Sequence, residues 1–247
     1  MENPNQIALM IGNSRLHWAI FAGTTLQKTW DTNHFTPETA NQLIGKFNSP
    51  SPIPLVLASV VPEQTALWQN YPHLHIITLD QLPLRGLYPT LGIDRALAVL
   101  GAGIELGWPL LIVDAGTAIT FTGADGNRCL VGGAILPGLT LQLSSLAQKT
   151  AALPLINLPE KLPPRWAVDT VEAIQSGVIY TVVAGVRDFI EDWRREFPES
   201  KIVLTGGDRT FLLTYLTIMF PDLATTIIEA APAIFWGIRE VLKSDNC

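Results

Sequence analysis

The sequence has 247 residues, of which 48% are hydrophobic and 15% are charged, and its net charge at neutral pH is −6. This composition excludes a disordered chain and is typical of a globular protein with one large domain or two moderate ones. The acidic balance and the lack of a Lys/Arg cluster argue against nucleic acid and against an anionic membrane surface as partners.

The N-terminus and the cysteines indicate the compartment. The first ten residues, MENPNQIALM, lack the basic and apolar regions of a signal peptide. No apolar run is long enough to span a bilayer, and Asp114 interrupts the most suggestive one. Cys129 and Cys247 do not form the pattern of a disulfide framework. We therefore expect a soluble cytoplasmic protein that does not bind membranes.

The first half of the chain is expected to alternate strands and helices. The predicted elements are strands at 7–11, 15–22 and 26–31, a helix at about 37–47, a strand at 55–60, a short helix after Pro62, a strand at 75–79 and a helix at 92–107. In the last helix, Ala96, Val99, Leu100 and Gly103 share one face, and Asp94 fits the N-cap position.

The second half is expected to open with another three-strand meander. The predicted elements are strands at 110–114, 118–123 and 128–136, a helix after Pro137-Gly138, a proline-rich loop at 153–168, a helix at 169–196, a strand and turn at 201–208, and two helical stretches on either side of 225–230. The alternation of the two element types predicts an α/β protein.

The two meanders resemble each other. When LMIGNSRLHWAIF is set over IVDAGTAITFTG, Gly12 falls on Gly116 and Met10 falls on Asp114. The chain therefore reads as two lobes, residues 1–107 and 108–247, each with a strand, a glycine turn and two further strands. Two such hairpins could close around the phosphates of a nucleotide, since ligand sites often lie between lobes.

Both glycine turns contain residues that suit an anion. Gly12-Asn13-Ser14 offers backbone amides that a phosphate could approach, together with side-chain donors, although a plain hairpin turn has the same composition. In Asp114-Ala115-Gly116-Thr117, the carboxylate ends a strongly apolar strand and must be paired or bind a cation. Capping of the turn's own amides is the alternative for Asp114.

Two further stretches could carry chemistry. Thr205-Gly206-Gly207-Asp208 follows a late strand, where small residues suit a flat ligand such as adenine, or simply a strand-to-helix turn. Asp94 and Arg95 are adjacent at a predicted helix start, where the carboxylate could accept a substrate proton and the guanidinium could hold an anion. A helix cap beside a solvated Arg is the alternative. His73 and His75 lack the partners of a metal site.

With these motifs assembled, the chain resembles the type III pantothenate kinase family along almost its whole length. The stretches that carry the resemblance, in the order of the family, are IGNSRLHWAIF, YPTLGIDRALAVLGA, LIVDAGTAITF, GGAILPGL, DTVEAIQSGVIY and VLTGGDRTFL. The resemblance implies the two-lobed α/β fold of acetate and sugar kinases, Hsp70 and actin, with duplicated strand meanders. The first lobe would carry the first phosphate loop and the substrate motif, and the second lobe the second phosphate loop and the adenosine-side motif.

The resemblance also implies the activity and the site. Members phosphorylate the 4′-hydroxyl of pantothenate with ATP and Mg²⁺, commonly need a monovalent cation such as K⁺ or NH₄⁺, and act as homodimers. Asp94 would be the base that accepts the hydroxyl proton, and Asp114 would bind the monovalent cation. The pantothenate pocket would consist of Tyr88, Gly92, Ile93, Asp94, Arg95 and Thr170. The ATP contacts would be Met10, Ile11, Gly12, Asn13, Ser14, Arg15, Leu16, His17 and Thr117.

Two positions depart from the family pattern. Met10 stands where the first phosphate loop usually begins with Asp, and Thr122 stands where a second Asp is usual. Either Mg²⁺ binding is weaker, or ATP and water hold the metal alone. The alternative to an active kinase is a catalytically silent relative that binds ATP or pantothenate and acts as a regulator. A third reading is another sugar or acyl kinase of the same fold.

Overall fold

The computed structural model describes residues 5–47 and 52–244 and divides into two compact units. Unit 1 contains the chain up to Glu105 together with the segment from Pro232 onward, and unit 2 is Leu106–Ala231. The sequence had placed all of 108–247 in one lobe. The structure instead assigns the C-terminal helix α8 (Ala233–Ser244) to unit 1, where it packs on α3.

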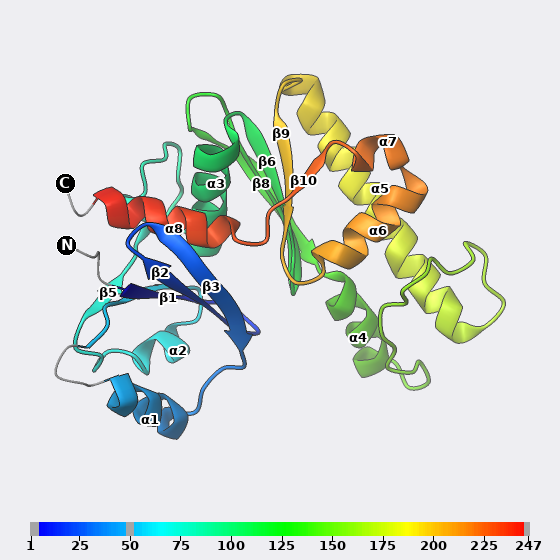
Figure 1. Cartoon of the computed structure of the whole chain (residues 1–247). Helices are drawn as coiled ribbons and strands as arrows, with labels where there is room; N and C mark the ends of the chain where they lie inside the picture. The colour runs from blue at the N-terminus through cyan, green and yellow to red at the C-terminus, as the bar shows by residue number, and fades with distance from the viewer. Residues whose placement is uncertain (1–4, 48–51, 245–247) are drawn as a thin grey trace. The chain divides into compact units, whose positions relative to one another are not determined.

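Unit 1 is built on a five-stranded mixed sheet with strand order β3-β2-β1-β4-β5. Strands β1, β2 and β3 form an antiparallel meander, and β4 and β5 run parallel to β1 (Figure 1). Its elements are β1 (Asn5–Ile11), β2 (Leu16–Ala22), β3 (Thr25–Thr32), α1 (Pro37–Phe47), β4 (Leu55–Ser59), α2 (Pro62–Ala66), β5 (Leu74–Ile76), the 3₁₀ turn η1 (Leu79–Gln81), α3 (Ile93–Leu106) and α8.

Unit 2 repeats this architecture. Its sheet has the order β8-β7-β6-β9-β10, with β6, β7 and β8 antiparallel and β9 and β10 parallel to β6. The predicted duplication of the strand meanders is therefore confirmed and extends to the two parallel strands of each sheet. The elements are β6 (Leu110–Ala115), β7 (Ala118–Ala124), β8 (Leu130–Pro137), α4 (Leu139–Lys149), α5 (Thr170–Glu196), β9 (Lys201–Thr205), α6 (Arg209–Met219), α7 (Pro221–Ala224) and β10 (Ile227–Glu229).

An aromatic cluster holds one face of the unit 1 sheet. The ring of Trp18 on β2 stacks on Trp30 of β3 with centroids 5.8 Å apart, and it meets Trp68 edge-on at 5.4 Å. Phe35 closes the cluster against Trp18 and Trp68. Since alternate residues of a strand point to opposite faces, the neighbours of Trp18 are directed to the other face of the sheet.

Helix α5 is the central helix of unit 2. By length and composition it could cross a membrane, the one such helix among the residues described. Its apolar positions instead form the core of the unit, together with side chains from the sheet and from α6. These buried positions are Ile174, Val178, Ile179, Val182, Val183, Val186 and Ile190. The packing of α5 inside unit 2 therefore accounts for its hydropathy.

Helices α3 and α8 approach each other through glycines. A Cβ at Gly101 of α3 would lie 2.1 Å from the carbonyl oxygen of Ala233, and a Cβ at Gly237 of α8 would lie 2.1 Å from that of Leu97. Only glycine permits this backbone contact. The close approach explains why the last helix of the chain belongs to unit 1.

Two local predictions were wrong. The strand expected at 75–79 is only Leu74–Ile76, because Thr78 and Gln81 form a capping box that turns the chain into η1. Asp94 is not the N-cap, because α3 already begins at Ile93. Its carboxylate instead lies in the first turn and accepts a hydrogen bond from the Arg95 amide at 2.8 Å.

The glycine contact between α3 and α8 predicts a sensitive position. The Gly237→Ala variant should lower the free energy of unfolding by about 1–3 kcal/mol, because the added methyl group meets a backbone carbonyl that cannot move away alone. Gly45→Ala is the matched control, since a Cβ there meets nothing within 4 Å on helix α1. That variant should be neutral or more stable by up to about 1 kcal/mol. Urea unfolding of both variants measures the difference, and equal stabilities would contradict the contact.

Candidate functional site

The first glycine hairpin joins β1 and β2. The Gly12 amide closes the turn by donating to the Arg15 carbonyl at 3.0 Å, and the Gly12 carbonyl accepts a hydrogen bond from His34 Nε2 at 2.8 Å. Gly12 does not adopt a positive φ, and a Cβ there would have its nearest contacts, the Arg15 carbonyl and His17 Nε2, at 3.4 Å. Neither backbone conformation nor crowding therefore requires a glycine at this position, which favours close approach by a ligand over a plain turn.

The rest of this hairpin divides into buried and exposed residues. Asn13, Ser14 and Arg15 are exposed at its tip, whereas Ile11 and Leu16 are buried in the strands that flank it. Met10 is 1% exposed and lies opposite His17 in the β1–β2 ladder. The position where the family usually has a carboxylate is thus filled here by a buried apolar side chain.

The residues of the predicted substrate motif gather at the start of α3. The Arg95 guanidinium is buried and donates from Nη1 to the Tyr88 hydroxyl at 3.2 Å. A Cβ at Gly92 would lie 2.4 Å from Asp94 Oδ1, so the glycine makes room for the carboxylate to fold back over the helix start. One carboxylate, one guanidinium and one phenol therefore lie together in unit 1.

The environment of Asp94 shifts its proton affinity. Burial raises the pKa of the Asp94 carboxyl above its ordinary value, and this effect outweighs the hydrogen bond from the Arg95 amide and the charges of Arg95 and His17, which lower it. A carboxylate with a raised pKa is a better proton acceptor than an exposed one. Asp94 therefore has the environment of a general base.

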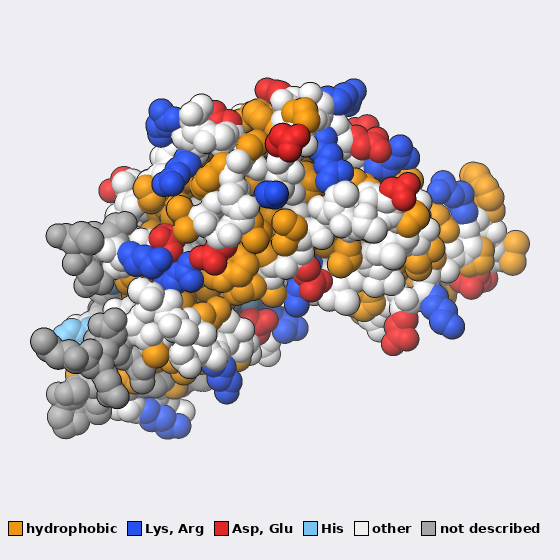
Figure 2. Space-filling model, turned by 45° about the horizontal axis from the view of Figure 1, so that its top comes forward, with side chains coloured by type: hydrophobic (Ala, Val, Ile, Leu, Met, Phe, Trp, Pro, Cys, Tyr) orange, Lys and Arg blue, Asp and Glu red, His pale blue; other side chains and the backbone are white. Residues whose placement is uncertain are grey.

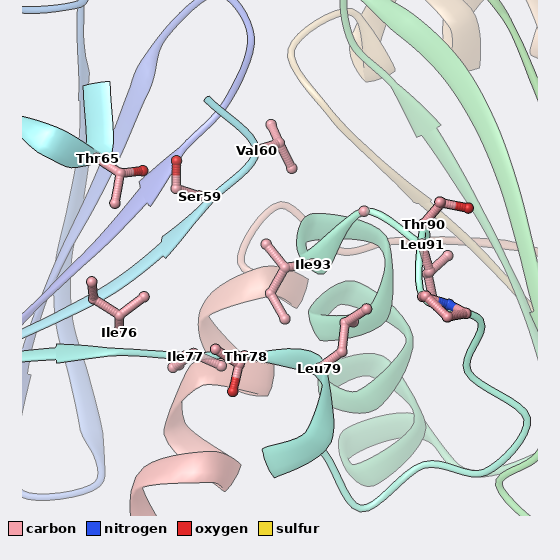
Figure 3. A pocket seen from close by; sticks show the side chains of 12 residues that line it. Ser59, Val60, Thr65, Ile76, Ile77, Thr78, Leu79, Thr90, Leu91 and Ile93 are labelled. Carbon is pink, nitrogen blue, oxygen red and sulfur yellow. The ribbon is translucent and has the colours of Figure 1, made fainter. Parts of the chain in front are cut away.

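A pocket of about 530 Å³ opens beside this helix start (Figure 3). It lies at the carboxyl ends of β4 and β5, where Ser59, Val60 and Ile77 line it, and Gly92 and Ile93 of the substrate motif form its border. The Val60 amide donates to the Ile11 carbonyl at 3.0 Å, so the pocket and the first hairpin share one edge of the sheet. The hydroxyl groups that line it belong to Ser59, Thr65, Thr78 and Thr90.

The second glycine hairpin joins β6 and β7 in unit 2. Gly116 also lacks a positive φ, and its nearest contact to a Cβ would be 3.6 Å, to Asp114 Oδ1. Two glycines that pack against this hairpin, Gly138 and Gly206, are by contrast required by the local structure. Gly206 has a φ of +94° and would clash with the Ala115 carbonyl, and a Cβ at Gly138 would lie 2.1 Å from the Gly116 carbonyl.

A second carboxylate lies beside this hairpin. The Asp208 amide donates to the Ala115 carbonyl at 2.8 Å, and its carboxylate accepts from the Thr140 hydroxyl at 3.2 Å. Burial raises the pKa of the Asp208 carboxyl, and the Thr140 hydrogen bonds oppose the shift. Across residues 5–47 and 52–244, however, no group of three or more His, Cys, Asp or Glu side chains could hold a metal ion.

The structure brings the predicted residues together in two sets. Unit 1 holds the hairpin from Met10 to His17 and the motif from Tyr88 to Arg95. The two are electrostatically linked, because the charge of His17 lowers the pKa of Asp94. Unit 2 holds Asp114 and Thr117 at its hairpin, and Thr170 at the first position of α5, where Asp169 caps the helix by accepting from the Glu172 amide.

Sequence reasoning missed three polar groups that border these sets. His34 holds the Gly12 carbonyl, Asp31 accepts from His17 Nδ1 at 2.8 Å, and Thr140 holds Asp208. The register of the β2–β3 hairpin could have located Asp31, because Asp31 and His17 are direct cross-strand partners. His34 and Thr140 are distant in sequence from the groups that they bind, and no local pattern marks them.

Comparisons with known proteins identify the family of this chain. The family description of the type III pantothenate kinases matches residues 7–192. The chain belongs to the type III pantothenate kinase family. The type III pantothenate kinase of Nostoc sp. is 51% identical over 96% of this chain and 94% of its own length, and that of Synechocystis sp. is 49% identical over 100% and 95%.

Solved structures share the fold. A protein described as a conserved putative Baf family transcriptional activator from Campylobacter jejuni superposes with a TM-score of 0.67 at 24% identity, covering 97% of this chain and 98% of that one. MreB 5 of Spiroplasma citri bound to AMPPNP superposes with a TM-score of 0.51 at 11% identity, covering 100% and 98%. The two-lobed α/β fold of actin-like proteins and sugar kinases is thus confirmed.

Proposed function

We propose that this chain transfers the γ-phosphoryl group of ATP to the 4′-hydroxyl of pantothenate, the first step of coenzyme A biosynthesis. The observation that carries the proposal is the cluster at the start of α3, in a chain that belongs to the type III pantothenate kinase family. There Gly92 lets the buried Asp94 carboxylate fold back beside Arg95, whose guanidinium meets the Tyr88 hydroxyl. One base and one anion-binding group are what phosphorylation of a hydroxy acid requires.

In this proposal, Asp94 accepts the proton of the 4′-hydroxyl while the hydroxyl oxygen attacks the γ-phosphorus and the bond to ADP breaks. Arg95 and Tyr88 would hold the carboxylate of pantothenate, and Gly92 and Ile93 border its pocket. Thr170, on unit 2, stays a predicted pantothenate contact. The mixture of apolar and hydroxyl groups in the pocket at β4 and β5 suits a ligand with both methyl and polar groups. Phosphoryl transfer relies mainly on such positioning and on charge neutralisation.

Each glycine hairpin would offer contacts to ATP. Met10 to His17 would be the contacts on unit 1 and Thr117 the contact on unit 2, where the open space at Gly207 suits the adenosine. Mg²⁺ would enter with ATP, held by phosphates and water, because the described residues provide no metal-binding carboxylate cluster. Asp114 would bind a monovalent cation, and comparison of the activity in K⁺ and in Na⁺ tests that part of the proposal.

A cytoplasmic homodimer is the proposed form of the enzyme. Large apolar side chains are exposed on unit 2 at Val131 and Ile135 of the edge strand β8 and at Trp166 and Val168 ahead of α5, and a second copy could cover them. On the face shown in Figure 2, Lys/Arg and Asp/Glu side chains are interspersed, which does not suit a nucleic-acid surface. Sedimentation of the purified chain measures the assembly directly.

The catalytically silent relative finds no support in the comparisons, and the chain retains Asp94, Arg95, Asp114 and Thr117. Another sugar or acyl kinase of the same fold would not need the Gly92–Arg95 motif, which resembles the substrate motif of the pantothenate kinases. Incubation with ATP, Mg²⁺, K⁺ and pantothenate, followed by mass analysis for phosphopantothenate, decides among the three readings.

The unconstrained hairpin glycines predict a separation of stability from binding. Gly12→Ala and Gly116→Ala should each change the free energy of unfolding by less than about 0.5 kcal/mol, because a Cβ fits both sites. Each should weaken ATP binding by about tenfold or more, because the methyl group keeps phosphate from the loop amides. Gly126→Ala, in an open turn of the β7–β8 hairpin, is the control and should bind ATP as the native chain does. Unchanged ATP affinity in both test variants by calorimetry would refute phosphate binding at the hairpins.

The buried base predicts opposite effects on turnover and stability. Asp94→Asn should lower kcat by about 100-fold or more, because the amide cannot accept the proton. Since burial raises the pKa of Asp94, the carboxyl favours folding at low pH and loses that contribution as pH rises through the raised value. The Asn variant should therefore be at least as stable as the native chain at pH 7.

Activity of the native chain should correspondingly fall as pH drops through the raised pKa of Asp94, above the range of an exposed Asp. Initial rates from pH 4 to pH 9 and urea unfolding at pH 7 supply both measurements. Asp188→Asn, an exposed change on α5, should alter neither. Turnover by the Asp94→Asn chain close to the native rate would remove Asp94 as the base.

A further inference from the structure

Three residues form a row across the first meander. His17 on β2 lies opposite Met10 of β1 on one side and opposite Asp31 of β3 on the other. Directly opposed residues project from the same face of a sheet, so this row lies on the face away from Trp18 and Trp30. The row therefore places a buried methionine, an imidazole and a carboxylate side by side at the Gly12 hairpin.

The two ring nitrogens of His17 face different groups. Nδ1 lies 2.8 Å from Asp31 Oδ1, and the two side chains are 39% and 47% exposed. Nε2 lies 3.4 Å from the place that a Cβ on Gly12 would occupy, so this edge of the ring lies beside the hairpin glycine. The carboxylate thus orients the ring so that its second nitrogen lies next to Gly12.

His17 also lies within electrostatic reach of the proposed base. Its positive charge lowers the pKa of Asp94, as a smaller effect than burial. The charged or titratable groups in this neighbourhood are Asp31 on β3, Asp94 and Arg95 on α3, Arg15 at the hairpin tip, and His34 on the Gly12 carbonyl. A cation at His17 would therefore offset part of the negative charge of Asp94 near the hairpin.

We propose that Asp31 and His17 form a proton-linked phosphate clamp, in which Asp31 holds the His17 Nδ1–H and His17 Nε2–H donates to a phosphate oxygen of ATP. The proposal rests on ATP binding at the first hairpin, as in the proposed function, and adds Asp31 as a positioning residue that acts through His17. ATP binding then takes up a proton from solvent at His17.

The proton uptake follows from the chemistry of the two partners. A neutral imidazole that donates Nδ1–H to Asp31 presents a lone pair at Nε2, which repels the oxygens of a phosphate because those oxygens only accept. The imidazolium form presents a donor at both nitrogens, and charge-assisted hydrogen bonds to phosphate are the stronger kind. In the proposed clamp, bound phosphate therefore favours the imidazolium over the neutral ring.

Titration calorimetry with ATP and Mg²⁺ tests the clamp on the full chain. Measurements at pH 7 in buffers of different ionisation enthalpy count the protons taken up on binding. The native chain should take up a fraction of a proton, whereas His17→Gln and His17→Lys should take up none at this position. His17→Gln should weaken ATP binding by about tenfold or more, and His17→Lys should bind within about threefold of the native chain. His73→Gln, an exposed change after α2, is the matched control and should keep both the affinity and the uptake.

The positioning role of Asp31 is tested in two backgrounds. Asp31→Asn should weaken ATP binding by about three- to tenfold in the native background, because the amide no longer favours the imidazolium. The same change should have no effect beside His17→Lys, because lysine needs no carboxylate to carry its charge. An equal loss in both backgrounds would show that Asp31 acts on the sheet alone and would overturn the clamp.

Two further outcomes separate this inference from the proposed function. Native affinity and native proton uptake in His17→Gln would overturn the clamp and leave the kinase proposal intact. ATP binding with His17-dependent proton uptake, without formation of phosphopantothenate, would support the clamp and refute the kinase proposal. No binding of ATP by the native chain would overturn both.

Discussion

The register between β2 and β3 is the constraint on which the site of unit 1 depends. Trp18 stacks on Trp30 with an interplanar angle of 5°, and its indole Nε1 donates to the Thr32 hydroxyl at 3.0 Å. A slip by one residue would send every side chain of a strand to the opposite face. The aromatic face thereby fixes His17 opposite Asp31 on the other face, and the stability of the core determines the geometry of the hairpin.

The glycines near the two hairpins have two different roles. Gly138 and Gly206 are required by the local structure, since a Cβ at either would strike a backbone carbonyl. Gly12 and Gly116 occupy equivalent hairpins in the two sheets, have ordinary backbone angles and have room for a side chain. A feature present in both copies without a packing reason in either supports the proposal that each hairpin contacts phosphate.

The sequence was sufficient to predict most of the elements, the duplicated meanders and the residues of both hairpins, because these follow from short-range periodicity and glycine placement. It was insufficient where distant segments decide. The return of α8 to unit 1 depends on the contact between Gly101 and Gly237, which are far apart in the sequence and meet only in the folded chain.

 The place of Asp94 was also mispredicted, since a carboxylate ahead of a helix and one in its first turn give the same local pattern. Asp31 and His34 were missed because cross-strand and loop contacts, not sequence neighbours, bring them to Gly12.

The charged side chains beside the first hairpin give a physical reason for a methionine at position 10. A carboxylate at this buried position would face His17 across the β1–β2 ladder and compete with Asp31 and with phosphate for the imidazole. With methionine there, His17 Nδ1 is held by Asp31 and Nε2 lies beside Gly12. In the proposed clamp, the methionine at position 10 and the histidine held by Asp31 would therefore be two parts of one arrangement.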